Sequence, residues 1–205
     1  MKHRPLAAAV AAFALAGAAH ADTLVNIKGF GADGAGADIY SYPVAPGTIV
    51  SLFNPVLVDL PAGDYLLGNA WGRPGALYDT WNFQADAAGS WGSHFVAAEV
   101  LGGGQYRMLV DGVSLKEPTC KNHFCAWDTQ AEARAAFLAT PPFTMRLDHA
   151  ATIAFASADY YLPDNLGGIS LLITAAPVPE PATFGLLGLG LALLGARASR
   201  ARRQS

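Results

Sequence analysis

Several aromatic residues of the chain are candidates for stacking on sugar rings. Trp71 stands in the segment Ala-Trp-Gly-Arg-Pro-Gly, where glycine and proline predict a loop and where Arg73 is close by. A large apolar ring has less reason to lie in a loop than in a strand, so we take Trp71 and Arg73 as the candidate carbohydrate site. Trp81 and Phe83 share one face if they lie on a strand, and there they are either core residues or a second stacking platform.

A polar segment before the apolar residues 169–174 is a candidate metal site. Asp164 and Asn165 open the sequence Asp-Asn-Leu-Gly-Gly-Ile-Ser, and Asp159 stands shortly before it. This pattern resembles the ends of several bacterial carbohydrate-binding jelly rolls, including small calcium-dependent lectins. The resemblance implies that Asp164 and Asn165, and more loosely Asp159, hold calcium, which takes about six to eight oxygen ligands. The alternative is an ordinary glycine turn in which Asn165 or Gly167 takes a positive φ.

Catalytic signatures do not occur in the sequence at the spacing that they require. The segment Gly-Val-Ser-Leu-Lys around Ser114 lacks the second glycine of a nucleophile elbow. His94, His123 and His149 do not fall into a repeat of the HExxH kind. Carboxylate pairs of glycosidases are distant in sequence, and nothing singles out two acids here. We therefore expect that the protein is not an enzyme.

The C-terminal segment indicates a membrane-directed signal. Val178-Pro-Glu-Pro181 precedes the apolar run Ala182–Ala196, and arginines at positions 197, 200, 202 and 203 follow. Arginines beside a hydrophobic segment stay on the cytoplasmic side of a membrane. A helix over this run would rise only about 22 Å, against roughly 30 Å of hydrocarbon, which suits a transient anchor better than a permanent span. The alternatives are an ordinary tail anchor and the last core helix of a soluble domain.

This tail, residues 178–205, resembles the PEP-CTERM sorting signal of Gram-negative bacteria. The matching features are Pro179, Glu180 and Pro181, the hydrophobic helix after them, and the terminal arginines. The resemblance implies that a membrane-embedded exosortase processes the tail at the Pro-Glu-Pro site. It also implies a secreted or surface protein of the kind often linked to exopolysaccharide and biofilm. Nothing about the preceding domain follows from it.

The N-terminal segment, residues 1–21, predicts a secretory signal peptide. A basic start precedes the apolar run Leu6–Ala18, and Ala19-His-Ala21 forms a small-x-small cleavage site. Cleavage after Ala21 would leave a chain that begins at Asp22. Residues 22–177 then form one exported domain, which is long enough to bury a core of its own.

The exported part is acidic and contains a single pair of cysteines. Residues 22–177 hold fifteen Asp or Glu against seven Lys or Arg, a net charge near −8, which argues against nucleic acid as a partner. Cys120 and Cys125 predict a local disulfide, because the exported compartment is oxidising. Free thiols are one alternative. A metal site with His123 is the other, although three ligands fall short of the four that structural zinc takes.

Brief apolar runs between Gly and Pro turns predict an all-β exported domain, an antiparallel β-sandwich like a jelly roll, flanked by the signal helix and the C-terminal hydrophobic helix. The segment from Leu60 to Leu67 resembles the strand entry of many bacterial extracellular sandwich domains. We expect the last strand to pair with the first. Other candidate strands include residues 38–42, 48–53, 56–60, 94–100, 105–111, 143–148 and 169–174.

A helical insertion interrupts the pattern of strands. Thr129 and Glu132 have the spacing of a capping box, which predicts a helix that ends near Leu138, before Pro141 and Pro142. Such an insertion either carries a functional loop or covers a sheet edge.

Two hypotheses for the function follow. The first is an exported, non-enzymatic surface or matrix protein that an exosortase-type system processes. The second adds calcium-assisted carbohydrate binding.

Overall fold

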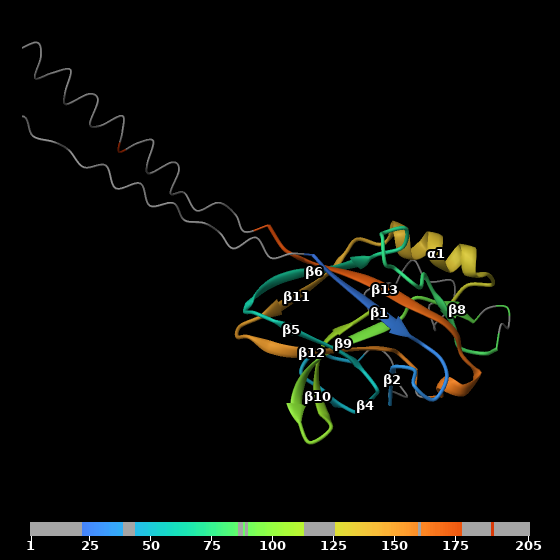
Figure 1. Ribbon diagram of the computed structural model, residues 1–205, viewed down its shortest axis with the longest axis horizontal. Coiled ribbons are helices and arrows are strands. Elements are labelled where there is room, and N and C mark those ends of the chain that lie inside the picture. The colour runs from blue at the N-terminus through green and yellow to red at the C-terminus, as the bar shows by residue number, and fades with distance from the viewer. Residues whose placement is uncertain are drawn as a thin grey trace, which may run out of the picture. The chain divides into compact units, whose positions relative to one another are not determined.

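Figure 1 shows a computed structural model of the chain, which describes residues 22–38, 44–85, 88, 90–112, 126–159, 161–177 and 190. About half of the described residues are in β-strands, and the other regular elements are the helix α1 (Gln130–Ala139) and the 3-10 turn η2 (Leu162–Asp164). This confirms the predicted mostly-β class with one helix. The predicted signal helix and C-terminal hydrophobic helix lie outside the described residues, apart from Gly190.

One sheet has the strand order β11-β6-β13-β7-β8, and β1 pairs with β13. All of its pairs are antiparallel. Its members are β1 (Thr23–Lys28), β6 (Gly63–Asn69), β7 (Trp81–Asn82), β8 (Trp91–Gly92), β11 (Phe143–Leu147) and β13 (Leu166–Ala175).

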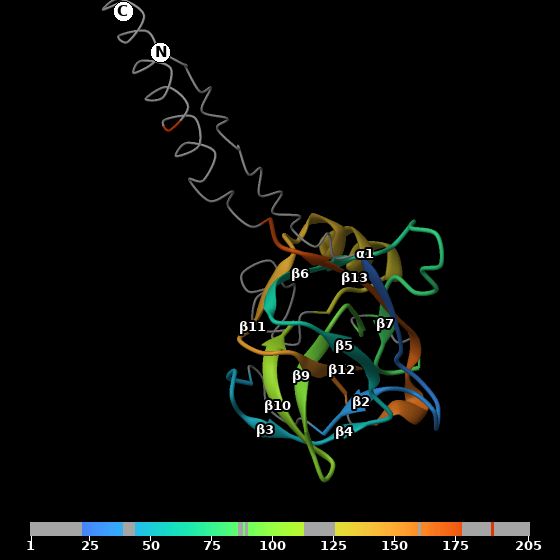
Figure 2. The same ribbon diagram turned by 60° about the vertical axis from the view of Figure 1, so that its left-hand side comes forward.

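The second sheet has the order β3-β10-β9-β12-β2-β4, and β5 pairs with β12 (Figure 2). Its pairs are antiparallel except for a parallel contact between Ser157 and Gly36. The strands are β2 (Gly36–Ala37), β3 (Ile49–Val50), β4 (Leu52–Phe53), β5 (Val56–Leu60), β9 (Phe95–Gly102), β10 (Gln105–Asp111) and β12 (Ala151–Ser157).

The longer strands alternate between the two sheets along the chain. The order is β1-β13-β6-β11 in one sheet and β5-β12-β9-β10 in the other. Among the connections between these longer strands, only the β9–β10 hairpin joins two strands of the same sheet. Every other connection takes the chain from one sheet to the other, across the shared core. The predicted pairing of the first and last strands is confirmed, from Thr23 opposite Ile173 to Lys28 opposite Gly168.

The core lies between the facing sides of the sheets. Alternate residues of β1 are buried, as the period of two requires, whereas residues 168–171 of β13 are all buried. Phe95 on β9 meets Phe143 on β11 edge to face, with ring centroids 5.1 Å apart, and this contact joins the two sheets. Trp81 is 1% exposed and its indole N–H donates to the His94 carbonyl at 3.0 Å, so it is a core residue rather than a stacking platform.

The sequence patterns locate several elements closely. Strands were predicted at 56–60 and 105–111, and β5 and β10 have these bounds. The strand predicted at 143–148 is β11, which ends one residue earlier, at Leu147. The capping box at Thr129 and Glu132 is present at the start of α1. The strand predicted at 48–53 is wrong as one element, because it is divided into β3 and β4, which pair with different strands. Residues 39–42 of the strand predicted at 38–42 lie outside the described part.

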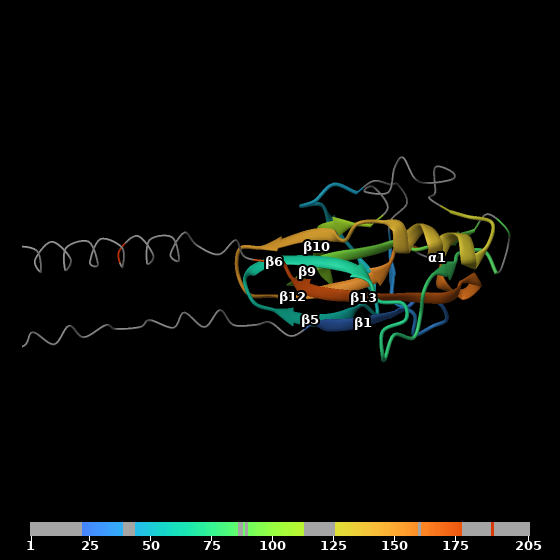
Figure 3. The same ribbon diagram turned by 90° about the horizontal axis from the view of Figure 1, so that it is seen from above.

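The helix α1 and the turn between β5 and β6 lie toward opposite ends of the domain (Figures 1 and 3). The helix packs near β8 and covers that end of the first sheet. The insertion was predicted either to carry a functional loop or to cover a sheet edge. Its described part, the helix α1, fits the second of these roles.

Candidate functional site

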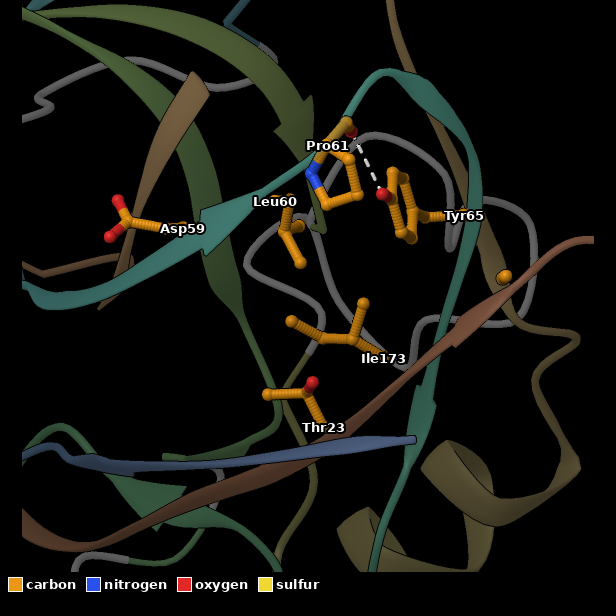
Figure 4. Close-up of a pocket in the computed structure, with 7 residues that line it drawn as sticks. Thr23, Asp59, Leu60, Pro61, Tyr65 and Ile173 are labelled. Carbon is orange, nitrogen blue, oxygen red and sulfur yellow. Dashed lines mark hydrogen bonds between the residues drawn. The ribbon is translucent and has the colours of Figure 1, made fainter. Parts of the chain in front are cut away.

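The first candidate site is a recess where the chain enters and leaves the β domain. We call this end the terminal pole, defined by the start of β1, the end of β5, the start of β6 and the end of β13. A cavity of about 170 Å³ opens there (Figure 4), lined by Thr23, Asp59, Leu60, Pro61, Tyr65, Ile173 and Ala175. The segment from Leu60 to Leu67, which was predicted to form a turn and a strand, thus also forms much of this recess.

Tyr65 fixes the wall of the recess. Its hydroxyl donates to the Pro61 carbonyl at 2.8 Å, across the turn that joins β5 to β6. Burial raises the pKa of the Tyr65 hydroxyl, so it stays protonated and continues to donate. Asp59 stands at the margin with its carboxylate directed away from Tyr65 (Figure 4), where it accepts from the Thr152 hydroxyl at 2.5 Å.

The surface around the recess carries more negative than positive charge. Asp59, Asp64 and Asp148 are all exposed. Arg146 lies between two of them, 3.1 Å from Asp148 and 3.8 Å from Asp64, and its own side chain is exposed as well. Exposed pairs of this kind contribute little to stability. The carboxylates of the terminal pole are therefore open to an outside partner.

The second candidate site is the loop that contains Trp71, whose ring is 42% exposed as the prediction requires. The cation beside it is Arg134 of α1, whose guanidinium carbon lies 5.5 Å from the ring centroid. Arg73 is exposed in the same loop, and its backbone forms turn hydrogen bonds with Ala70 and Ala76. Arg134 thus lies beside the ring, and the carbohydrate site at Trp71 and Arg73 stays a prediction.

A buried carboxylate holds Arg134 in this position. Asp79 is 5% exposed and accepts from the Gln130 amide at 2.8 Å and from Arg134 at 3.3 Å. It also accepts from the Thr80 backbone N–H at 2.8 Å. Asp79 therefore ties the Trp71 loop to α1, and sequence reasoning missed it because Asp79 is far from both partners along the chain.

The predicted calcium ligands lie near η2. Asp159 accepts from the Tyr161 backbone N–H at 3.0 Å, which makes it part of a local turn. Asp164 Oδ1 and both amide atoms of Asn165 are buried without a hydrogen-bond partner, although Asn165 is only 3% exposed. Gly167, and not Asn165, takes a positive φ, of 78°. Within the described ranges, no three His, Cys, Asp or Glu residues are grouped as a metal site would require, and calcium binding stays a prediction.

The candidate sugar and calcium residues are not brought together. Asn69, two residues before Trp71, pairs with Leu171 in the middle of β13. Asn165 precedes the start of the same strand, about 20 Å away at the rise of a β-strand. A calcium ion held at Asn165 would therefore lie away from Asn69, where the Trp71 loop begins.

A third charged cluster lies on the second sheet. Glu99 has a side chain that is 11% exposed, and it binds Arg107 at 2.7 Å and His149 at 3.0 Å. Burial alone would raise the pKa of Glu99, but the hydrogen bonds from Arg107 and His149 outweigh it and hold this pKa below its ordinary value. The carboxylate thus joins β9, β10 and the turn between β11 and β12.

Ala21, Pro179, Glu180 and Pro181, the predicted processing residues, lie outside the described residues, and so do Cys120 and Cys125. The predicted disulfide stays a prediction. No helix within the described ranges has the length and apolar character needed to cross a membrane.

Comparison with known families identifies the tail. Residues 177–203 match the family model for the PEP-CTERM protein-sorting motif. The resemblance read from Pro179, Glu180, Pro181 and the arginine cluster is thereby confirmed. No curated protein and no solved structure matches the chain. The motif implies export, transient anchoring through the C-terminus and recognition by an exosortase, a membrane-embedded processing enzyme.

Proposed function

We propose that the protein is a non-enzymatic surface or extracellular-matrix protein whose β domain stays outside the cell after an exosortase has processed its tail. The observation that carries this proposal is the sorting motif at residues 177–203. The strand orders of the two sheets support a jelly-roll sandwich as the exported domain. The carboxylates of Asp79 and Glu99 are each held by an arginine and by a further side chain, which supports a structural role for them rather than an acid or base role.

Mass spectrometry of the secreted protein tests the route. We expect a product that begins at Asp22 and ends between Pro179 and Pro181. A product that still carries Arg202 and Arg203 would contradict the proposal. Deletion of the host's exosortase should leave a longer, membrane-associated form.

Association with exopolysaccharide and the lack of enzymatic activity need separate experiments. The purified mature protein should co-sediment with polysaccharide extracted from its host, and a polysaccharide from an unrelated source serves as the control. Turnover in a screen of glycoside and ester substrates would show that the protein is an enzyme.

A second candidate function is carbohydrate binding through Trp71. The exposed ring lies in a loop, and Arg134 is held beside it by the buried Asp79. An aromatic ring fixed in this way provides a rigid face for the C–H groups of a sugar. The unpaired oxygens of Asp164 and Asn165 favour a separate polar occupant such as calcium.

A glycan array on the mature protein tests this candidate. Trp71→Ala should abolish binding and leave the melting temperature nearly unchanged, because the ring is half exposed. Leu77→Ala is the matched control, since Leu77 is 66% exposed and lies in the same loop. For calcium, the melting temperature should rise at millimolar concentrations in the parent and not in Asp164→Asn. Retention on no glycan and no thermal shift would eliminate the candidate.

A further inference from the structure

The two ends of the β domain emerge side by side. Thr23, the first residue of β1, is paired with Ile173 in an antiparallel register, and β13 ends at Ala175. Paired Cα atoms in such a ladder are about 5 Å apart. Segments attached before Asp22 and after Ala175 therefore join the domain at the same place, the terminal pole.

The processing site is close to this pole by chain length alone. The segment from Ala175 to Pro179 spans at most about 14 Å when fully extended. A domain of this size has a radius of gyration of about 15 Å, so the connection is shorter than the radius of the domain itself. An enzyme that cuts at Pro179–Pro181 consequently acts within about 21 Å of Ala175.

We infer that the terminal pole, with its recess and the exposed Asp59, Asp64 and Asp148, is a docking surface for the exported loops of the exosortase. This inference rests on the proposed processing of the tail. The charge of the pole fits a basic protein surface, since Asp64 and Asp148 share the guanidinium of Arg146, while Asp59 is paired with the neutral Thr152 hydroxyl. The same charge disfavours an anionic lipid surface, which attracts basic rather than acidic segments.

The recess offers shape complementarity to a partner in addition to the charge of the pole. Its cavity of about 170 Å³ is bounded by Leu60, Pro61 and Ile173 and opens beside both exits of the chain. This space accommodates one side chain of a partner loop. The domain thus contributes contacts to processing in addition to the Pro-Glu-Pro motif.

Charge reversal in the full-length protein, expressed in its own host, tests this inference. The pole variant combines Asp59→Lys with Asp148→Lys. The matched control combines Asp33→Lys with Asp38→Lys, two exposed carboxylates away from the pole, of which Asp33 pairs with Lys28 as Asp148 pairs with Arg146. Pulse labelling and mass analysis follow removal of the tail and, separately, removal of the signal peptide.

We expect the pole variant to lose its tail at least about fivefold more slowly than the parent and the control to change less than about twofold. Signal peptide removal and the melting temperature of the mature variants should match the parent. An unchanged rate in the pole variant overturns the inference. A faster rate also overturns it, because it would show attraction to anionic lipid.

A longer connection sharpens the test. Insertion of a Gly/Ser segment of about 20 residues between Ala176 and Pro177 gives a flexible span of about 25 Å, which frees the cut site from the pole. Charge reversal should then have less than about a twofold effect, and a persisting fivefold effect contradicts docking at the pole. If the parent itself is never trimmed at Pro179–Pro181, the proposed function fails; if it is trimmed and the pole variant matches it, only the docking inference fails.

Discussion

The terminal pole and the α1 end of the domain both carry carboxylates, but they hold them differently. At the α1 end, Asp79 is 5% exposed and engaged by Gln130 and Arg134. At the pole, the side chains of Asp64 and Asp148 are 60% and 83% exposed, and Arg146 is the partner of both. A buried, paired charge is costly to lose, whereas an exposed one is screened by water. At the α1 end, the carboxylate therefore stabilises the packing of the Trp71 loop on α1. At the terminal pole, the carboxylates remain accessible to a partner.

The largest expected change in stability comes from comparing a carboxylate of the α1 end with one of the terminal pole. Asp79→Ala should lower the free energy of unfolding by about 2–3 kcal/mol, because the buried Thr80 backbone N–H loses its acceptor, as do the exposed Gln130 amide and the partly exposed Arg134 guanidinium. Asp64→Ala should change it by less than about 0.5 kcal/mol. Urea unfolding of the two variants measures both values, and equal losses would show that the distinction between the ends is wrong.

Glu99 provides a second buried carboxylate, outside both ends of the domain. It tests whether a buried carboxylate stabilises the fold wherever it lies. Its pKa is lowered in the folded state below the ordinary value of 4.5, so its contribution to stability is present above that value and is lost as the pH falls through the lowered pKa. Glu99→Gln should cost about 1–2 kcal/mol at pH 7 and progressively less in acid. Thermal unfolding between pH 7 and pH 3 measures the difference, and a cost that does not change with pH would contradict the ion-pair explanation.

Loss of the N-terminal cap of α1, at the same end of the domain as Asp79, should lower the free energy of unfolding by a smaller amount. The Thr129 hydroxyl accepts from the Glu132 N–H at 3.2 Å, and the Glu132 carboxylate accepts from the Thr129 N–H at 3.1 Å. Thr129→Ala should therefore cost about 1 kcal/mol. Hydrogen exchange should show faster opening of the first turn of α1, while the β1–β13 amides exchange as in the parent.

The smallest expected effect belongs to the pole. Arg146→Ala removes the only guanidinium between Asp64 and Asp148, yet the free energy of unfolding should change by less than about 0.5 kcal/mol, because all three side chains are exposed. The same variant makes the pole more acidic. Tail removal should consequently be as fast as in the parent or faster, and slower removal with unchanged stability would argue against a basic partner.

Local patterns in the sequence predicted the elements whose structure depends on nearby residues. The alternation in residues 143–147 and the spacing of Thr129 and Glu132 were enough to place a strand and a helix start. Strand boundaries were not predicted correctly where one short apolar run pairs with two different strands, as β3 and β4 do. Local propensity contains no information about which neighbour a strand selects.

The candidate sites show the same limit. An exposed Trp71 was predictable from its loop composition, but Arg134 came to its side through Asp79, a contact between residues distant in the sequence. Nothing in the segment around Arg134 indicates a partner in the Trp71 loop. The recess at the pole likewise joins residues from β1, β5, β6 and β13, so it exists only once the sheets have assembled.

The pairing of the first and last strands also determines how the domain responds to mechanical force. A load applied between the two ends of the domain acts at Thr23 and Ala175, at the same end of the β1–β13 ladder. Such a load separates the ladder one hydrogen bond at a time, instead of shearing all its bonds together. A tether that holds the domain by one end alone leaves this ladder without tension, so loss of the C-terminal attachment would relieve the domain of that load.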